Sequence, residues 1–179
     1  PGGDASHGMV RLSLDDAHVL TARVDGSRES GTVTVEGAAW GKDRLVAVFP
    51  QSARGLLNRL EFTKADISAS VEWNSVGVLS RGEIAPAEGG EAFASYTAEM
   101  PSEADSRLEG RLDLGSGFVA AVCTGRSLDS FDAVSTFENL DLVDAIVLAT
   151  GAEPPAEVYG AVTGAVNVQS RPEFEYYMY

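Results

Sequence analysis

The sequence predicts an all-β protein in which helices are confined to the connections between strands. Residues 31–37 (GTVTVEG) show the pattern most cleanly, because Val33 and Val35 alternate with polar residues. Similar runs recur along the whole chain, and short breaks rich in glycine, proline or acidic residues separate them. A series of about nine to eleven such strands is typical of a β-sandwich or barrel.

The expected strands follow one another closely from the N-terminus. They are expected at residues 9–14, 18–24, 31–37, 43–49, 60–73, 75–84, 91–100, 107–114, 117–123, 139–150 and 161–170. Residues 85–91 (APAEGGE) and 151–160 (GAEPPAEVYG) are loops by composition. No Pro/Ser-rich linker divides the chain, and its 179 residues fit one domain.

Two short helices are expected between strands. Residues 52–60 (SARGLLNRL) can begin at Ser52 as N-cap, and their leucines share one face. Residues 126–137 (RSLDSFDAVSTF) space three apolar side chains three apart, which predicts the second helix. Neither segment is long enough to be stable without tertiary packing.

The charge balance limits the partners of the chain. Formal net charge is −14, and only two of the 13 basic residues are lysines, Lys42 and Lys64. Phosphate binding relies on clustered lysine and arginine, so the printed chain is not expected to wrap nucleic acid by itself. An acidic surface instead suits cations or basic partners. No apolar stretch approaches a membrane span, and the opening residues PGGDASHGM contain no apolar run of a secretory signal.

Signatures of catalysis are absent from the sequence, and we predict no enzymatic activity. Cys123 lies among apolar neighbours and is expected to be a small buried residue. The two histidines, His7 and His18, lie near the N-terminus, and no metalloprotease, P-loop or nucleophile-elbow motif is present. Three pairs of acids are expected to be solvated surface groups rather than a glycosidase couple: Asp15 with Asp16, Glu103 with Asp105, and Asp141 with Asp144.

The order of the segments resembles that of a known family. A strand leads into a helix-like segment at 52–60 and then into paired strands at 60–73 and 75–84; later, a proline-containing loop and a last strand lead into Arg171-Pro172. This layout resembles the shell domain of jelly-roll coat proteins of small icosahedral plant RNA viruses. It is most similar to the bromovirus-like proteins, and ourmia-type and ilar-type viruses remain alternatives. The resemblance covers most of residues 30 to 179.

The resemblance implies an eight-stranded jelly-roll β-sandwich with short crossover helices. It divides the chain into an N-terminal segment (1–30), a shell domain (31–170) and a C-terminal arm (171–179). It implies a capsid protein that self-assembles into an icosahedral shell around an RNA genome, located in the virion and, during assembly, in the host cytoplasm. Such coat proteins usually contact RNA through a basic N-terminal arm. Residues 1–11 offer only Arg11, so this contact is expected from an arm outside the printed chain. Calcium ions at subunit interfaces are a further expectation.

The aromatic C-terminal segment RPEFEYYMY is the expected intersubunit contact. Proline redirects the chain after the last strand, and the aromatic residues beyond it belong to the types enriched at interface hot spots. Folding back over its own domain is the alternative for this segment. The residues expected to make the contact are Arg171, Pro172, Phe174, Tyr176, Tyr177 and Tyr179.

A second function class fits the same composition. A secreted or surface β-sandwich could bind carbohydrate or a protein, with Trp40, Trp73 and Tyr96 as candidate sugar-stacking residues. Core packing is the competing interpretation of these aromatic residues. An enzyme on a sandwich scaffold is the third alternative, because a fold alone does not decide function.

Overall fold

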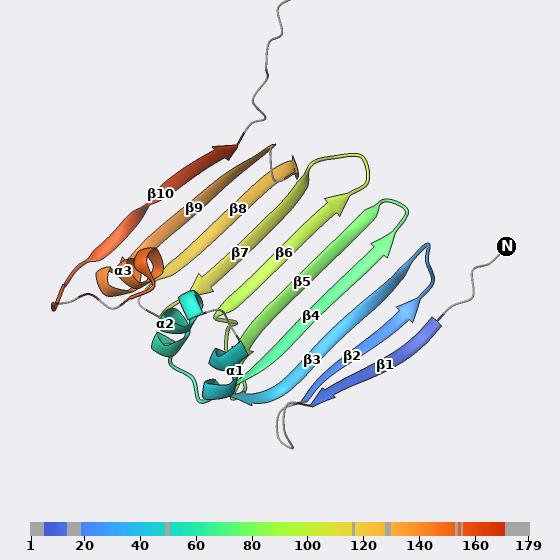
Figure 1. Cartoon of the computed structure of the whole chain (residues 1–179), viewed down its shortest axis with the longest axis horizontal. Helices are drawn as coiled ribbons and strands as arrows, with labels where there is room; N and C mark the ends of the chain where they lie inside the picture. The colour runs from blue at the N-terminus through green and yellow to red at the C-terminus, as the bar shows by residue number, and fades with distance from the viewer. Residues whose placement is uncertain are drawn as a thin grey trace, which may run out of the picture.

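One antiparallel sheet of ten strands dominates the computed structural model, and every strand pairs with its neighbour in sequence (Figure 1). The structure describes residues 6–13, 19–48, 51–115, 117–127, 130–152, 154 and 156–170. The strands are β1 (Ser6–Ser13), β2 (Val19–Gly26), β3 (Gly31–Gly41), β4 (Lys64–Asn74), β5 (Gly77–Pro86), β6 (Ala94–Pro101), β7 (Ser106–Asp113), β8 (Phe118–Ser127), β9 (Ser130–Asp141) and β10 (Ala161–Ser170).

The all-β prediction is confirmed, whereas the eight-stranded jelly roll is not. A jelly roll packs two sheets whose strands are connected across the sandwich. The described strands form a single open sheet in sequence order, with β1 and β10 at its edges. The first two strands, which precede the expected shell domain, belong to this same sheet.

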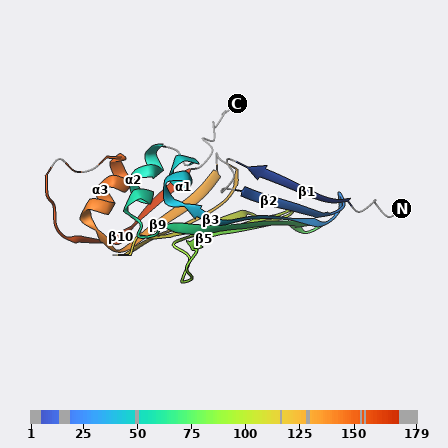
Figure 2. The ribbon, with the colours of Figure 1, turned by 90° about the horizontal axis from the view of Figure 1, so that it is seen from below.

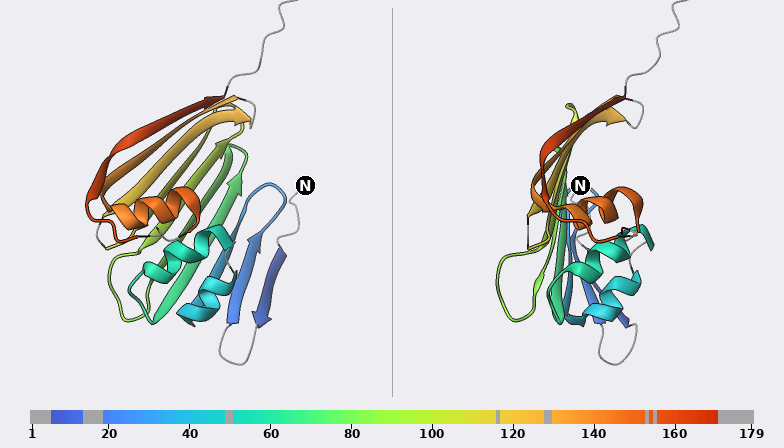
Figure 3. Two further views of the ribbon diagram at one scale, coloured as in Figure 1. Left: turned by 60° about the vertical axis from the view of Figure 1, so that its left-hand side comes forward. Right: turned by 90° about the vertical axis from the view of Figure 1, so that its left-hand side faces the viewer.

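Three short helices lie on one face of the sheet, near one end of the strands (Figures 2 and 3). They are α1 (Lys42–Val48) and α2 (Gln51–Arg59), between β3 and β4, and α3 (Leu142–Thr150), between β9 and β10. The predicted helix at 52–60 is therefore confirmed. The strands expected at 43–49 and 139–150 were wrong, because these segments are largely α1 and α3. The helix expected at 126–137 was also wrong, because this segment runs from the end of β8 through most of β9.

Local capping explains why residues 142–150 are helical. The Asp141 carboxylate accepts a hydrogen bond from the Val143 backbone N–H at 2.8 Å, which caps the N-terminus. Gly151 ends the helix in the left-handed conformation, and its N–H donates to the Val147 carbonyl. Asp141 therefore starts the helix directly at the end of β9, and Gly151 ends it after nine residues.

The strand register assigns each side chain to one of two faces. In β4 the odd-numbered residues are apolar, from Ala65 to Trp73, whereas the even-numbered residues are charged or polar. Leu112, Val119 and Phe137 pack against the core beneath the helices, and the register places them on the same face as the odd-numbered residues of β4. Directly paired residues of neighbouring strands share a face. We call the two sides the helix-side face and the outer face.

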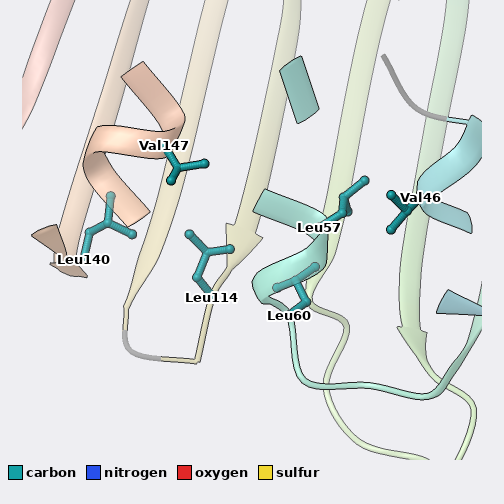
Figure 4. Close-up of a cluster of buried hydrophobic side chains, with 6 residues drawn as sticks. All are labelled: Val46, Leu57, Leu60, Leu114, Leu140 and Val147. Atoms are coloured by element: carbon teal, nitrogen blue, oxygen red, sulfur yellow. The ribbon is translucent and has the colours of Figure 1, made fainter. Parts of the chain in front are cut away.

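The hydrophobic core is small and lies between the helices and one end of the sheet (Figure 4). Leu57 of α2, Leu60 directly after α2, and Val147 of α3 form one cluster with Leu140 of β9 and Leu114, which follows β7. Side chains of the adjacent strand rows pack against this cluster. No residue of β5, β6, β7 or the described part of β8 is fully buried, so the middle of the sheet is a single layer.

The sheet is curved as well as twisted. Its edge strands β1 and β10 bend toward the side that carries the helices, so the helix-side face is concave (Figures 2 and 3). Bulges fall where two strands approach the helices, between Gly37 and Trp40 on β3 and between Val162 and Gly164 on β10. Such bulges increase local twist and bending.

Candidate functional site: the helix-side face of the sheet

The helix-side face carries no charged side chain on any described strand position that the register assigns to it. The central row across the sheet illustrates this: Ala22, Val35, Ala69, Gly82, Tyr96, Gly110, Ala121, Ser135 and Val166 lie side by side. The rows above and below it are equally free of charge. The part of this face that lies outside the core could carry charged side chains without disturbing the packing. Burial in the core therefore does not explain why the whole face is uncharged.

The outer face has the opposite character. Arg23 of β2 pairs with Glu36 of β3 at 2.7 Å, and His7 of β1 lies 3.0 Å from Asp25 of β2. Further charged side chains lie on the outer face of the central strands. The outer face is therefore the solvated side of the sheet, and its ion pairs are exposed and individually weak.

Only one end of the helix-side face is covered by the helices. Beyond the core, large apolar side chains remain accessible: Tyr96 is 40% exposed, Met100 45%, Leu108 49% and Val168 52%. We call this uncovered region the open apolar face. It consists of Val24, Val33, Val71, Trp73, Val78, Tyr96, Met100, Leu108, Cys123, Val166 and Val168.

The open apolar face is large for an isolated domain. Nine strands, from β2 to β10, lie about 4.8 Å apart and span about 38 Å, and three rows about 7 Å apart add about 14 Å in the strand direction. The product is about 540 Å², toward the upper end of the range for the largest apolar patch on an ordinary monomer. Patches of this size commonly mark an interaction site.

Two tryptophans on the helix-side face, Trp40 and Trp73, lie against glycines of β3. A Cβ atom on Gly31 or on Gly37 would collide with the ring of Trp73 or of Trp40, respectively. Because glycine has no side chain, each indole ring can pack directly against the backbone of the sheet. Both indole N–H groups donate to backbone carbonyls, from Trp73 to Ser27 at 3.0 Å and from Trp40 to Val19 at 3.3 Å.

Tyr96 lies across the central row in the same way. Its ring occupies the space that a side chain at Gly82 would fill, and its hydroxyl lies 3.0 Å from the Ser80 hydroxyl. The polar atom of Tyr96 is therefore already hydrogen-bonded within the sheet.

These positions decide part of the sugar-stacking hypothesis. Trp40 is 1% exposed and lies in the core, so its role as a sugar-stacking residue was wrong. Trp73 of β4 and Tyr96 of β6 both lie on the open apolar face, on the two strands that flank β5. Stacking by these two residues stays a prediction.

A cleft of about 690 Å³ opens beside the core, between the helices and the adjacent strand ends. Arg59 of α2 binds the carboxylate of Asp144 of α3 at this cleft, and its guanidinium lies 4.0 Å from Asp141. Asp144 is 3% exposed. The expectation of a solvated surface acid was therefore wrong for Asp144, which instead joins two helices. Its paired residue Asp141 caps α3.

The remaining candidate groups do not form a reactive constellation in the described part of the chain. No set of three or more His, Cys, Asp or Glu residues there could hold a metal ion. Cys123 is half-buried on the open apolar face rather than fully buried. Asp105 forms an exposed pair with Arg126 at 2.7 Å. Tyr159 donates to Glu157 at 2.7 Å, which raises the pKa of Tyr159, in an exposed loop.

Several predicted sites lie outside the described residues. They include the acid pair at positions 15 and 16, His18, and the expected C-terminal arm: Arg171, Pro172, Phe174, Tyr176, Tyr177 and Tyr179. Calcium at subunit interfaces also stays a prediction. Among the described helices, none has the length and apolar character needed to cross a membrane.

Comparison with known proteins identifies no relative. The chain matches no protein-family model, no curated protein and no solved structure.

Proposed function

We propose that the protein is a non-catalytic binding protein that holds a long apolar molecule, of the acyl-chain class, against the open apolar face. The observation that carries this proposal is the absence of charge from the helix-side face of ten consecutive described strands. This function belongs to the binding-module class that the composition also favours, with a different ligand chemistry.

The chemistry of the face favours an apolar ligand over a polar one. A protein partner typically makes about one hydrogen bond per 100 to 200 Å², or about three to six over a patch of this size. The indole of Trp73 and the hydroxyls of Tyr96 and Ser80 already bond within the sheet. A sugar would have to leave its hydroxyls unpaired over most of this surface, which costs free energy at each group.

The curvature favours a flexible or convex ligand. Two concave faces brought together would meet at their rims and leave a gap between their centres, whereas close packing is needed for dispersion contacts. An alkyl chain can follow the curved floor and pack against the helix layer at one end. Each methylene removed from water contributes about 0.8 kcal/mol.

A matched pair of substitutions tests the site. Val168 on the helix-side face and Val134 on the outer face lie on neighbouring strands, and they are 52% and 40% exposed. Val168→Glu places a carboxylate on the open apolar face, and Val134→Glu adds the same charge on the other side. The probe is a fluorescent monoacylglycerol, because a neutral headgroup avoids repulsion by a chain of net charge −14.

We expect the native chain and Val134→Glu to bind the probe alike, and Val168→Glu to bind at least tenfold more weakly. A tenfold loss corresponds to about 1.4 kcal/mol, less than the cost of desolvating an unpaired carboxylate. Equal loss in both variants, or no binding by the native chain, would overturn the proposal. A soluble oligosaccharide in a parallel titration tests the carbohydrate alternative.

Assembly into an icosahedral coat stays a second proposal with less geometric support. The resemblance rested on the layout of a two-sheet sandwich, and the described strands form one open sheet. Short helices between strands, which that layout also contains, are present at α1, α2 and α3. Sedimentation separates the proposals, because coat-protein particles have megadalton mass and a ligand carrier remains close to a small multiple of 18.8 kDa.

A further inference from the structure

The edge strand β10 is the only described strand without a charged residue. Its sequence, AVTGAVNVQS, also contains no proline. Edge strands normally carry charged residues or proline, because their unpaired backbone groups otherwise recruit another strand. Strand β10 departs from this rule, whereas each of the nine other described strands carries at least one charged residue.

The backbone edge of β10 that faces away from β9 is available for pairing. No described strand pairs with this edge, and most residues of β10 are exposed, including Val166 and Val168 at 52% each. Residues 164–170 run away from α3 toward the far end of the sheet (Figure 1). This half of the strand can accept a neighbour without displacing the helix.

We propose that β10 is a homodimerisation edge, at which β10 of a second copy pairs antiparallel to extend the sheet to twenty strands. An uncharged strand is complementary to itself, because no like charges meet across a two-fold axis. The other edge, β1, carries His7 and Arg11 and is less suited to self-pairing. This inference does not rest on the proposed ligand.

One register uses the side chains of β10 best. With Asn167 opposite Asn167 of the second copy, Val166 faces Val168 of that copy, and the reverse pair forms by symmetry. Two β-branched pairs then lie on the helix-side face, and β-branched cross-strand pairs stabilise sheets. The two-fold axis runs perpendicular to the sheet, so both open apolar faces point the same way and become continuous.

Charge exchange at position 167 tests this pairing. Asn167→Lys and Asn167→Asp each place like charges opposite one another in the dimer, whereas a mixture of the two variants places opposite charges there. Sedimentation equilibrium over 1 to 200 μM should give a native mass of twice 18.8 kDa. We expect each variant alone to associate about tenfold more weakly, and the equimolar mixture to recover dimers.

The control is Thr136→Lys, which adds the same charge on the outer face of β9, one strand away from the edge. It should dimerise like the native chain. Hydrogen exchange should also show that amides of residues 164–170 become protected as concentration rises. A native chain that remains monomeric at 200 μM, an equal loss in Thr136→Lys, or a mixture that fails to recover dimers would each overturn the proposal.

Discussion

Breaking the ion pair between Arg59 and Asp144 should lower the stability of the protein, and the loss should depend strongly on which of the two residues is replaced. The Asp144 side chain is 5% exposed, whereas 31% of the Arg59 side chain reaches solvent. Arg59→Met leaves a buried carboxylate without its guanidinium partner. Breaking a buried pair typically costs 3 to 5 kcal/mol, and we expect about 3 kcal/mol because Arg59 is partly solvated.

The reverse substitution should cost less. After Asp144→Leu, Arg59 retains access to water and to Asp141, whose carboxylate lies 4.0 Å away. We expect a loss of about 1 kcal/mol, since no charge is left buried. In the double variant the buried carboxylate is absent, so its total loss should fall short of the sum of the single losses by about 2 kcal/mol.

Urea denaturation followed by circular dichroism measures these free energies of unfolding, provided that the urea dependence of stability is similar in all four proteins. Additivity of the two single losses within about 0.5 kcal/mol would refute the reasoning. A larger loss for Asp144→Leu than for Arg59→Met would also refute it. The loss of stability would then not come from a buried Asp144 carboxylate that lacks the Arg59 guanidinium.

Three further outcomes are expected. Leu140→Ala, at a position with no exposed surface, should lower stability by about 3 kcal/mol in urea denaturation, and a loss below 1 kcal/mol would contradict its place in the core. Asn139 has a φ of 49°, so Asn139→Gly should raise the melting temperature by a few degrees, whereas a decrease would show that its side chain matters more than backbone strain. Gly31→Ala should destabilise more than Gly82→Ala in the same assay, because its Cβ would lie 2.7 Å from the Asp25 carbonyl, while the Tyr96 ring above Gly82 can move toward solvent; equal losses would contradict this.

The alternating strands were predictable because each has one apolar and one polar face. Residues 31–37 lie within β3, and the pattern at 60–73 covers most of β4. Periodicity of two is a local property, so it survives without knowledge of the tertiary fold. The number of sheets is not local, and the same strands could have been divided between two layers.

The helix-forming segments were harder to recognise from composition. Residues 45–48 (LVAV) are a short apolar run, and residues 142–149 (LVDAIVLA) are apolar except for Asp144. Periodicity alone does not decide whether such short segments form a strand or a helix. In α3 the signals were Asp141 before the run and Gly151 after it, which are typical helix caps. The burial of Asp144 could not be anticipated, because its partner Arg59 lies 85 positions away in sequence.

The open apolar face was visible in parts but not as a whole. Each strand shows its own apolar set, and only the register aligns those sets on one side of the sheet. The curvature, and the fact that three helices cover one end alone, depend on packing between distant segments. Val166 and Val168 illustrate this, because their pattern alone is equally compatible with a strand whose apolar side is covered.

The order of the strands also bears on how the chain folds. Every strand pairs with the one before it, so the sheet can grow hairpin by hairpin, and most pairings close only short loops. The two exceptions are the connections that contain the helices, between β3 and β4 and between β9 and β10. Proteins rich in contacts between sequence neighbours fold quickly for their size. The strands within residues 64–141 can therefore pair early. Pairing of β3 with β4 and of β9 with β10 should be the rate-limiting step of folding.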